Sequence, residues 1–75
     1  MTLNQLKYAI VVSESESFNI AAKKLYISQP SLSTSIHALE EEVGIQIFRR
    51  SQNGIAVTPD GKEFLGYARQ VMEQF

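Results

Sequence analysis

Apolar residues recur every three or four positions in two short runs near the middle of the chain. Those of the first run lie on one side of a helix, and they are Phe18, Ala21, Ala22 and Leu25. Those of the second run form the buried seam of a further helix, and they are Leu32, Ile36, Leu39 and Val43. Because the second helix should begin near Gln29, only residues 26–28 are left between the two helices, so the pattern predicts a sharp turn and a helix-turn-helix over residues 18–37.

Capping residues indicate where the second helix begins and ends. Ser28 is suited to cap its N-terminus, and Pro30 is tolerated in the first turn, where backbone N–H groups lack partners within the helix. Gly44 then ends the helix, so we expect it to span about residues 29–43. Tyr26 stands where many such turns carry a residue that tolerates positive φ, which allows a mildly strained or rearranged turn.

The side of the second helix that faces away from the seam is polar and rich in short side chains. It carries Pro30, Thr34, His37 and Glu41, with Ser31 and Ser33 on its flanks, and Gln29 lies at the entering end of the helix. Such a face suits a helix that presents its first turns to base edges, where glutamine pairs with adenine and hydroxyls pair with either base or phosphate. The N-terminus of the helix, at Ser28, also favours a phosphate. The alternative is an ordinary solvated helix face.

A further helix is predicted near the N-terminus. Thr2 and Gln5 have the spacing of a capping box, so this helix should begin at Leu3. Its inward stripe is expected to be Leu3, Leu6 and Ile10, with Val11 or Val12 adding area. The polar run of residues 13–17 is typical of a helix end and a loop.

Beyond residue 44 the pattern changes to the short alternation that is typical of strands. The residues that predict a β-hairpin wing over about residues 45–58 are Ile45, Ile47, the Asn53–Gly54 pair expected at its turn, and Ile55–Val57. Arg49, Arg50 and Ser51 lie on the approach to that turn, where a guanidinium group holds a phosphate or reaches into a narrow minor groove. The alternative is that both arginines are solvated surface residues.

The C-terminal part of the chain predicts a last helix, with Thr58 as its cap and Pro59 as its first residue. Its wide apolar stripe comprises Phe64, Leu65, Ala68, Val71, Met72 and Phe75. An isolated chain would expose part of this stripe to water, so we expect it to pair with a second copy. Packing on its own domain alone would account only for the first turns of this helix.

Together these features resemble the N-terminal domain of LysR-type transcriptional regulators. The matching residues are Ser17–Phe18, Ala21–Ala22, Leu25, Ser28–Ser33, Ile36, Leu39–Glu40, Gly44, Phe48–Arg50, Thr58–Pro59 and Gly61. The resemblance implies a mainly α fold, a winged helix-turn-helix with a three-helix core and a short β-hairpin wing in residues 1–58. A long linker helix is then expected to begin at residue 59 and to carry dimer contacts.

The same resemblance implies that the protein binds double-stranded operator DNA as a homodimer or a higher oligomer. In that family a separate effector-binding domain follows the DNA-binding domain. A small-molecule effector is therefore expected to act only through a domain that is absent from this chain.

Composition indicates one small soluble domain with a modest core. The chain has 75 residues, of which 44% are hydrophobic, and no cysteine, so neither disulfides nor thiolate metal sites are expected and a reducing cytoplasm fits. No apolar run is long enough to cross a membrane, and no membrane partner is expected. His37 is the only histidine, and Glu40–Glu42 diverge around their helix, so we expect no enzyme, metal or cofactor site.

Charge is the feature that fits DNA binding least well. The net charge is −1, whereas neutralising phosphates normally calls for a basic domain. The distribution matters more, because Glu40–Glu42 lie at the far end of the predicted reading helix while Arg49 and Arg50 lie in the wing. We therefore favour sequence-specific DNA binding in transcription regulation. The alternative, which the acidic balance supports, is a winged helix that serves only as a protein-interaction or dimerisation module.

Overall fold

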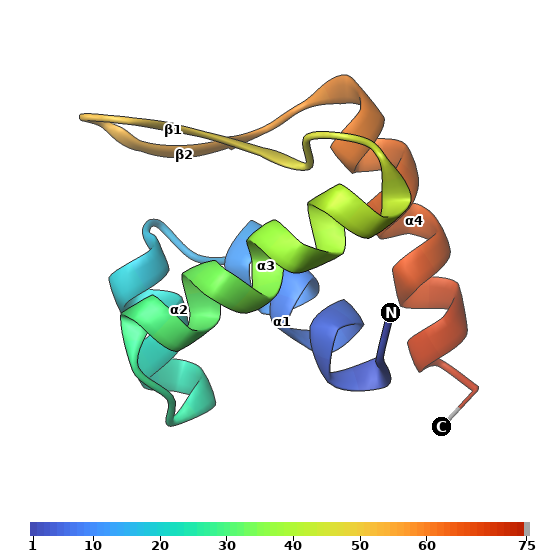
Figure 1. The fold of residues 1–75 in the computed structure, drawn as a ribbon, viewed down its shortest axis with the longest axis horizontal. Helices are drawn as coiled ribbons and strands as arrows, with labels where there is room; N and C mark the ends of the chain where they lie inside the picture. Colours follow the sequence, from blue (N-terminus) through green and yellow to red (C-terminus); the bar gives the residue numbers. More distant parts are fainter. Residues whose placement is uncertain (75) are drawn as a thin grey trace.

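Three helices pack around one core, a β-hairpin projects beside them, and a further helix closes the fold (Figure 1). The computed structural model describes residues 1–74. The elements along the described chain are α1 Leu3–Ser13, α2 Phe18–Leu25, α3 Gln29–Val43, β1 Phe48–Ser51, β2 Gly54–Val57 and α4 Pro59–Met72. This is the winged helix-turn-helix that the sequence predicts.

Each predicted cap lies where the pattern put it. The Thr2 and Gln5 side chains form the reciprocal capping box that starts α1, with both hydrogen bonds at 3.0 Å. Ser28 accepts a hydrogen bond from the backbone N–H of Ser31 at 3.2 Å and so starts α3. Gly44 ends α3 with a φ of 76°, which confirms the predicted bounds of this helix.

The turn between α2 and α3 contains the strain that the sequence allows. Tyr26 has φ 58° and ψ 38°, the left-handed conformation, and it is the one non-glycine residue with positive φ in residues 1–74. Its side chain is 95% exposed, so no packing holds it there. Ile27 follows and packs against the core, which compensates for the sharp change of chain direction.

The core lies where α1, α2 and α3 meet, and it is closed by α4. The seam residues Leu32, Ile36 and Leu39 are buried, as predicted. In α1 the prediction was partly wrong, because Leu3 is 43% exposed and Ala9 is fully buried. The reason is that α1 packs against three other helices, so its buried face is Leu6, Ala9 and Val12, where a small side chain permits close approach.

The hairpin pairs β1 and β2 in antiparallel register, from Phe48 opposite Val57 to Ser51 opposite Gly54. Its two turn residues are therefore Gln52 and Asn53, and the prediction that Asn53–Gly54 forms the turn pair was off by one position. Gly54 instead takes the first place in β2 with a φ of 119°. A side chain there would meet the carbonyl oxygen of Glu16 at 2.8 Å, so both the conformation and the space require glycine.

The junction between the hairpin and α4 is built on Ile47, which precedes β1 and is fully buried in the core. Its carbonyl oxygen accepts a hydrogen bond from the backbone N–H of Thr58 at 3.0 Å. The Thr58 hydroxyl donates to the carbonyl of Gln46 and accepts from the N–H of Gly61 at 2.9 Å, which caps α4. These bonds fix where the hairpin leaves the core.

Candidate nucleic-acid interface

The residues predicted to read bases lie within residues 28–37, at the N-terminal end of α3, and the hairpin runs beside this helix (Figure 1). Those that are exposed to solvent are Ser28, Pro30, Ser31, Thr34 and His37. Gln29 and Ser33 are half-buried because they face the hairpin. One continuous surface therefore joins the entering end of α3 to β1.

Ser33 links α3 to the hairpin. Its Oγ accepts one hydrogen bond from Gln29 Nε2 and one from Arg50 Nη2, both at 2.7 Å. The Arg50 guanidinium carbon also lies 3.7 Å from the centroid of the Phe18 ring, a cation–π contact. Phe18 in turn packs edge-to-face on Phe48, with ring centroids 6.0 Å apart. The sequence placed Arg50 in the wing, but it gave no sign that this side chain contacts both α2 and α3.

A hollow of about 240 Å³ opens beside this cluster. It is lined by the start of α2, by Gln29 and by the hairpin, and its residues include Ser17, Asn19, Arg50, Ser51 and Gln52. A helix N-terminus and a guanidinium group both favour an anion, so the hollow suits a phosphate of a nucleic-acid backbone. Asn19 and Gln52 were not among the predicted site residues, because the prediction took its site from the second central helix and from residues 49–51 alone.

The two wing arginines differ in their surroundings. Successive side chains on a strand point to opposite faces, so Arg49 lies on the other face of β1 from Arg50. Arg49 is exposed, and it makes no hydrogen bond or ion pair with a side chain among residues 1–74. On α2, Lys24 Nζ donates to Ser15 Oγ at 3.3 Å, and Lys23 is exposed.

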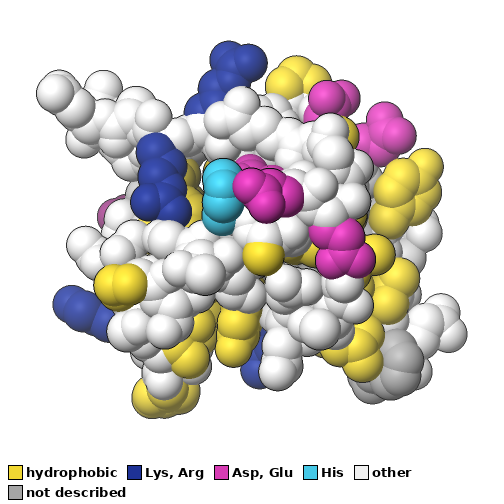
Figure 2. Space-filling model, viewed as in Figure 1, with side chains coloured by type: hydrophobic (Ala, Val, Ile, Leu, Met, Phe, Trp, Pro, Cys, Tyr) yellow, Lys and Arg dark blue, Asp and Glu magenta, His cyan; other side chains and the backbone are white. Residues whose placement is uncertain are grey.

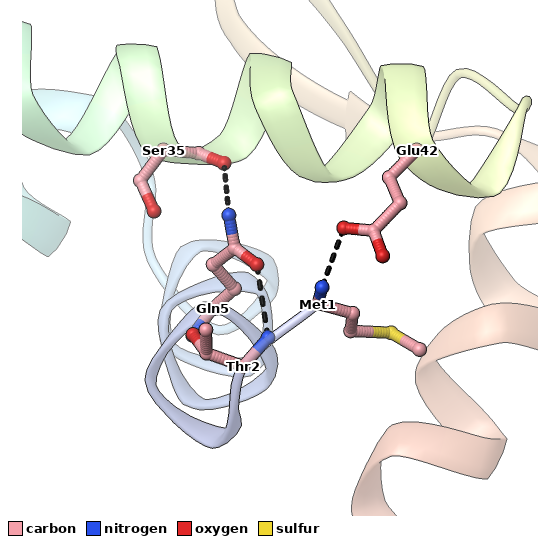
Figure 3. Close-up of polar contacts among 5 residues, drawn as sticks. All are labelled: Met1, Thr2, Gln5, Ser35 and Glu42. Carbon is pink, nitrogen blue, oxygen red and sulfur yellow. Dashed lines mark hydrogen bonds and ion pairs between the residues drawn. The ribbon is translucent and has the colours of Figure 1, made fainter.

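The three consecutive glutamates of α3 have separate roles. Glu40 Oε2 accepts hydrogen bonds from the backbone N–H groups of Ile47 at 2.7 Å and Phe48 at 3.1 Å, so this carboxylate holds the segment that leads into β1. Glu42 pairs with the α-amino group of Met1 (Figure 3). Glu41 lies 3.2 Å from His37 one turn earlier, and both side chains are exposed.

Acidic and basic side chains are separated across the surface. On the face seen in Figure 2, acidic groups gather toward the C-terminal end of α3 and the start of α4, and basic groups lie mainly toward the hairpin and α2. The start of α1 also contacts the middle of α3, where Gln5 Nε2 donates to the carbonyl of Ser35 at 3.4 Å (Figure 3). The reading end of α3 is therefore the less acidic end.

The apolar stripe of α4 is divided between two faces. Leu65 and Ala68 are buried within the chain's own core, so their side chains offer little surface to a partner. Val71 is 40% exposed, and Tyr67, which the apolar pattern did not single out, is 61% exposed. Phe64 and Met72 are half-buried. Phe75, also predicted to lie in this stripe, is outside the described residues.

The fold and this surface define the class of protein as a winged helix-turn-helix. Residues 3–62 match the model of the bacterial regulatory helix-turn-helix proteins of the lysR family. The chain belongs to that family.

Curated relatives carry names of the same kind. The chain is 43% identical over 72 residues to the HTH-type transcriptional regulator TfdT of Cupriavidus pinatubonensis, covering 96% of this chain and 32% of that protein. It is 44% identical over 72 residues to BenM of Acinetobacter baylyi, covering 96% of this chain and 24% of BenM. The chain thus spans between a quarter and a third of the length of these relatives, which are named as regulators and not as enzymes.

Solved structures with DNA are similar along almost the whole chain. A crystal structure of a CbnR_DBD–DNA complex has a TM-score of 0.95 with 40% identity, and the match covers 99% of this chain and 85% of that one. The complex of BenM_DBD with catB site 1 DNA has a TM-score of 0.92 with 43% identity, covering 99% and 80%. In residues 1–74, no helix has the length and apolarity needed to cross a membrane.

Proposed function

We propose that this chain is the DNA-binding part of a transcriptional regulator, and that it binds specific sites in double-stranded operator DNA as a dimer. The observation that carries the proposal is the similarity in fold, at 40% identity, to a relative whose crystal structure contains DNA. The polar face of α3 beside an arginine-bearing hairpin supports the same reading. The cytoplasm is the proposed location.

We assign base contacts to the entering end of α3, at Gln29, Pro30, Ser31, Ser33, Thr34 and His37. Backbone contacts are assigned to Ser28 at the helix start and to Arg49, Arg50 and Ser51 in the hairpin. This division follows the usual one, in which side chains on a helix read base edges and cationic groups hold phosphates. Glu40 and Glu42 have no part in it, since both bind groups within the chain.

Residues 1–58 form the proposed DNA-binding domain, and the helix from residue 59 is the proposed start of a linker. An effector-binding domain is proposed for the remainder of the full-length protein, outside this chain. Pairing of two chains is assigned to α4, through Phe64, Val71 and Met72 together with the exposed Tyr67. A two-fold pair presents two reading helices to two half-sites, so dimerisation should strengthen operator binding.

The test is selection of bound DNA from a random pool, followed by competition titrations on the selected site. We expect an enriched sequence with two related half-sites. Gln29→Ala should weaken binding to that site by about 1 to 3 kcal/mol and change binding to random DNA little. Gln70→Ala, an exposed glutamine on α4 away from the proposed interface, is the matched control and should bind like the parent chain.

A chain that enriches no sequence at low salt would contradict the proposal. That result would favour a winged helix that acts only in protein interaction or dimerisation. The acidic balance of the chain is the observation on which this second function rests.

A further inference from the structure

We propose that the Ser33 hydroxyl reads DNA only as a hydrogen-bond donor, because two other side chains occupy its lone pairs. Its partner on DNA is therefore an acceptor, either on a base edge or on a phosphate. The hydroxyl discriminates against the amino groups of cytosine and adenine. The inference rests on the proposed function and adds a polarity to one of its contacts.

A serine hydroxyl has one proton to donate and two lone pairs to accept with. In Ser33 both lone pairs are used, since Gln29 Nε2 and Arg50 Nη2 each donate to Oγ at 2.7 Å. Only the proton is left for a further partner. A group that can only donate bonds to N7 of either purine, to O6 of guanine, to O4 of thymine or to a phosphate oxygen, and it repels an amino group.

Arg50 fixes the direction of one of these two hydrogen bonds. A guanidinium group has five donors and no acceptor, so its bond to Ser33 has one direction. The side chain is also stacked on Phe18, a buried ring that itself packs on Phe48, which limits the geometries open to it. A small rotation of the Arg50 side chain therefore does not free the lone pair of Ser33 Oγ to which it donates.

The Ser33 proton is not used within the protein. Serines in helices commonly donate to a carbonyl oxygen three or four residues earlier, and Ser13 and Ser15 do so at 2.6 and 2.7 Å. Among residues 1–74 the Ser33 hydroxyl has no such acceptor. Because Ser33 is only half-buried, a group outside the protein can reach it. Its proton is free to meet DNA.

Neighbouring hydroxyls at the same end of α3 lack this restriction. Ser31 Oγ accepts one bond, from Ser28 at 2.8 Å, and keeps a lone pair as well as its proton. Thr34 is exposed, and its hydroxyl has no hydrogen bond within residues 1–74. Both can donate or accept, so Thr34→Ala is a matched control that removes a hydroxyl of unrestricted polarity.

Gln29 gains an orientation from the same contact. One of its two amide protons is directed to Ser33, which leaves the other proton and the carbonyl oxygen Oε1 for a partner. This remaining pair is the one that matches adenine, whose N6 donates and whose N7 accepts. Ser33 thus reads an acceptor itself and also positions the glutamine.

The experiment uses the parent chain on the site selected from a random pool. One acceptor is altered at a time. A 7-deaza analogue in place of each purine removes the N7 acceptor, and 2-aminopurine in place of each guanine removes the acceptor at position 6. In the same way, 4-thiothymine in place of each thymine weakens the acceptor at position 4, and a methylphosphonate replaces each phosphate. We expect one position where loss of the acceptor lowers the DNA affinity of the parent chain about tenfold. At that position the affinity of Ser33→Ala should fall less than about twofold. Thr34→Ala should keep the full tenfold effect. The four kinds of replacement distinguish a base edge from a phosphate.

Polarity is tested by exchanging base pairs at that position when it is a base edge, or at the pair beside it when it is a phosphate. A base exchange that brings an amino group to face Ser33 should lower the DNA affinity of the parent chain more than removal of the acceptor alone does. We call this additional loss of affinity the excess. Arg50→Met frees a lone pair, so this excess should fall severalfold, whereas Arg50→Lys keeps a donor and should retain it. Arg49→Met removes the same charge from the other face of β1 and should leave the excess unchanged.

The inference is overturned if Ser33→Ala has the same positional profile as the parent chain, or if Arg50→Met leaves the excess intact. Failure of the proposed function is a different result, since the parent chain would then select no site. Circular dichroism checks that each variant is folded, and the base exchanges on the parent chain test polarity without any substitution.

Discussion

A pair of glycines in α4 gives opposite predictions for the same substitution. Gly61 lies in the first turn of the helix, and a methyl group there would approach the carbonyl oxygen of Ile47 to 2.3 Å and its Cα to 3.0 Å. All of the obstructing atoms belong to the backbone, so no side chain can rotate away. Gly66 lies in the same helix with nothing within 4 Å of the corresponding position.

The magnitude follows from these distances. Forcing an extra methyl group into a packed site costs about 1 to 3 kcal/mol, and a backbone obstacle belongs at the upper end of that range. Alanine regains about 1 kcal/mol of helix propensity over glycine, so Gly61→Ala should destabilise the fold by about 2 kcal/mol. Gly66→Ala keeps the propensity gain alone and should stabilise it by up to about 1 kcal/mol.

Thermal unfolding followed by circular dichroism measures the change in stability of both variants. For a domain of this size 1 kcal/mol shifts Tm by roughly 4 to 8 °C, so Gly61→Ala should lower Tm by about 10 °C and Gly66→Ala should raise it by a few degrees. DNA binding should fall for Gly61→Ala alone, because Ile47 leads directly into β1 and Arg50. Shifts of the same sign in the two variants would refute the reasoning from close approach.

Three further predictions concern the turn, the wing and α4. Tyr26→Gly should stabilise the fold by up to about 1 kcal/mol in denaturant titrations, because a φ of 58° strains a side chain that is 95% exposed and packs on nothing. Arg50→Ala should reduce the slope of log affinity against log salt by about 1.8 for a dimer, and Arg49→Ala, on the other face of β1, by less than half of that; equal slopes would contradict the assignment. Val71→Asp should give a folded monomer in sedimentation experiments, whereas Gln70→Asp, an exposed neighbour given the same charge, should remain a dimer.

The helices could be predicted from the sequence because their causes are local. A cap such as Ser28 acts on an N–H group three residues away, and the seam of α3 follows from a period that is visible in the sequence. The conformation of Tyr26 was anticipated for the same reason, since its place in a short turn demands it. Local rules failed for Leu3, where packing on three helices decided which face of α1 is buried, and for the hairpin turn, which lies one position before Asn53–Gly54.

The contacts that organise the candidate site could not be predicted in this way. Arg50 meets Ser33 across 17 residues and Phe18 across a longer stretch, and no periodicity relates positions on different elements. Their meeting depends on the direction in which the hairpin leaves the core. That direction is set by Glu40, which binds the N–H groups at the entry to β1, and by Thr58 at its exit.

The same contacts explain why net charge was a poor guide to function. A sum of charges treats every carboxylate as equally able to repel a phosphate, but Glu40 is bound by two backbone N–H groups and Glu42 pairs with an amino group. Glu41 lies beside His37, the last of the proposed reading residues, but at 1.5 Å of rise per residue it is about 12 Å along α3 from Ser33. Repulsion between charges in water is screened beyond about 8 to 10 Å at physiological salt, so Glu41 has little effect at the first turns of the helix. The hairpin presents a local positive field from Arg49 and Arg50, and a domain with net charge −1 can present that field without being basic overall.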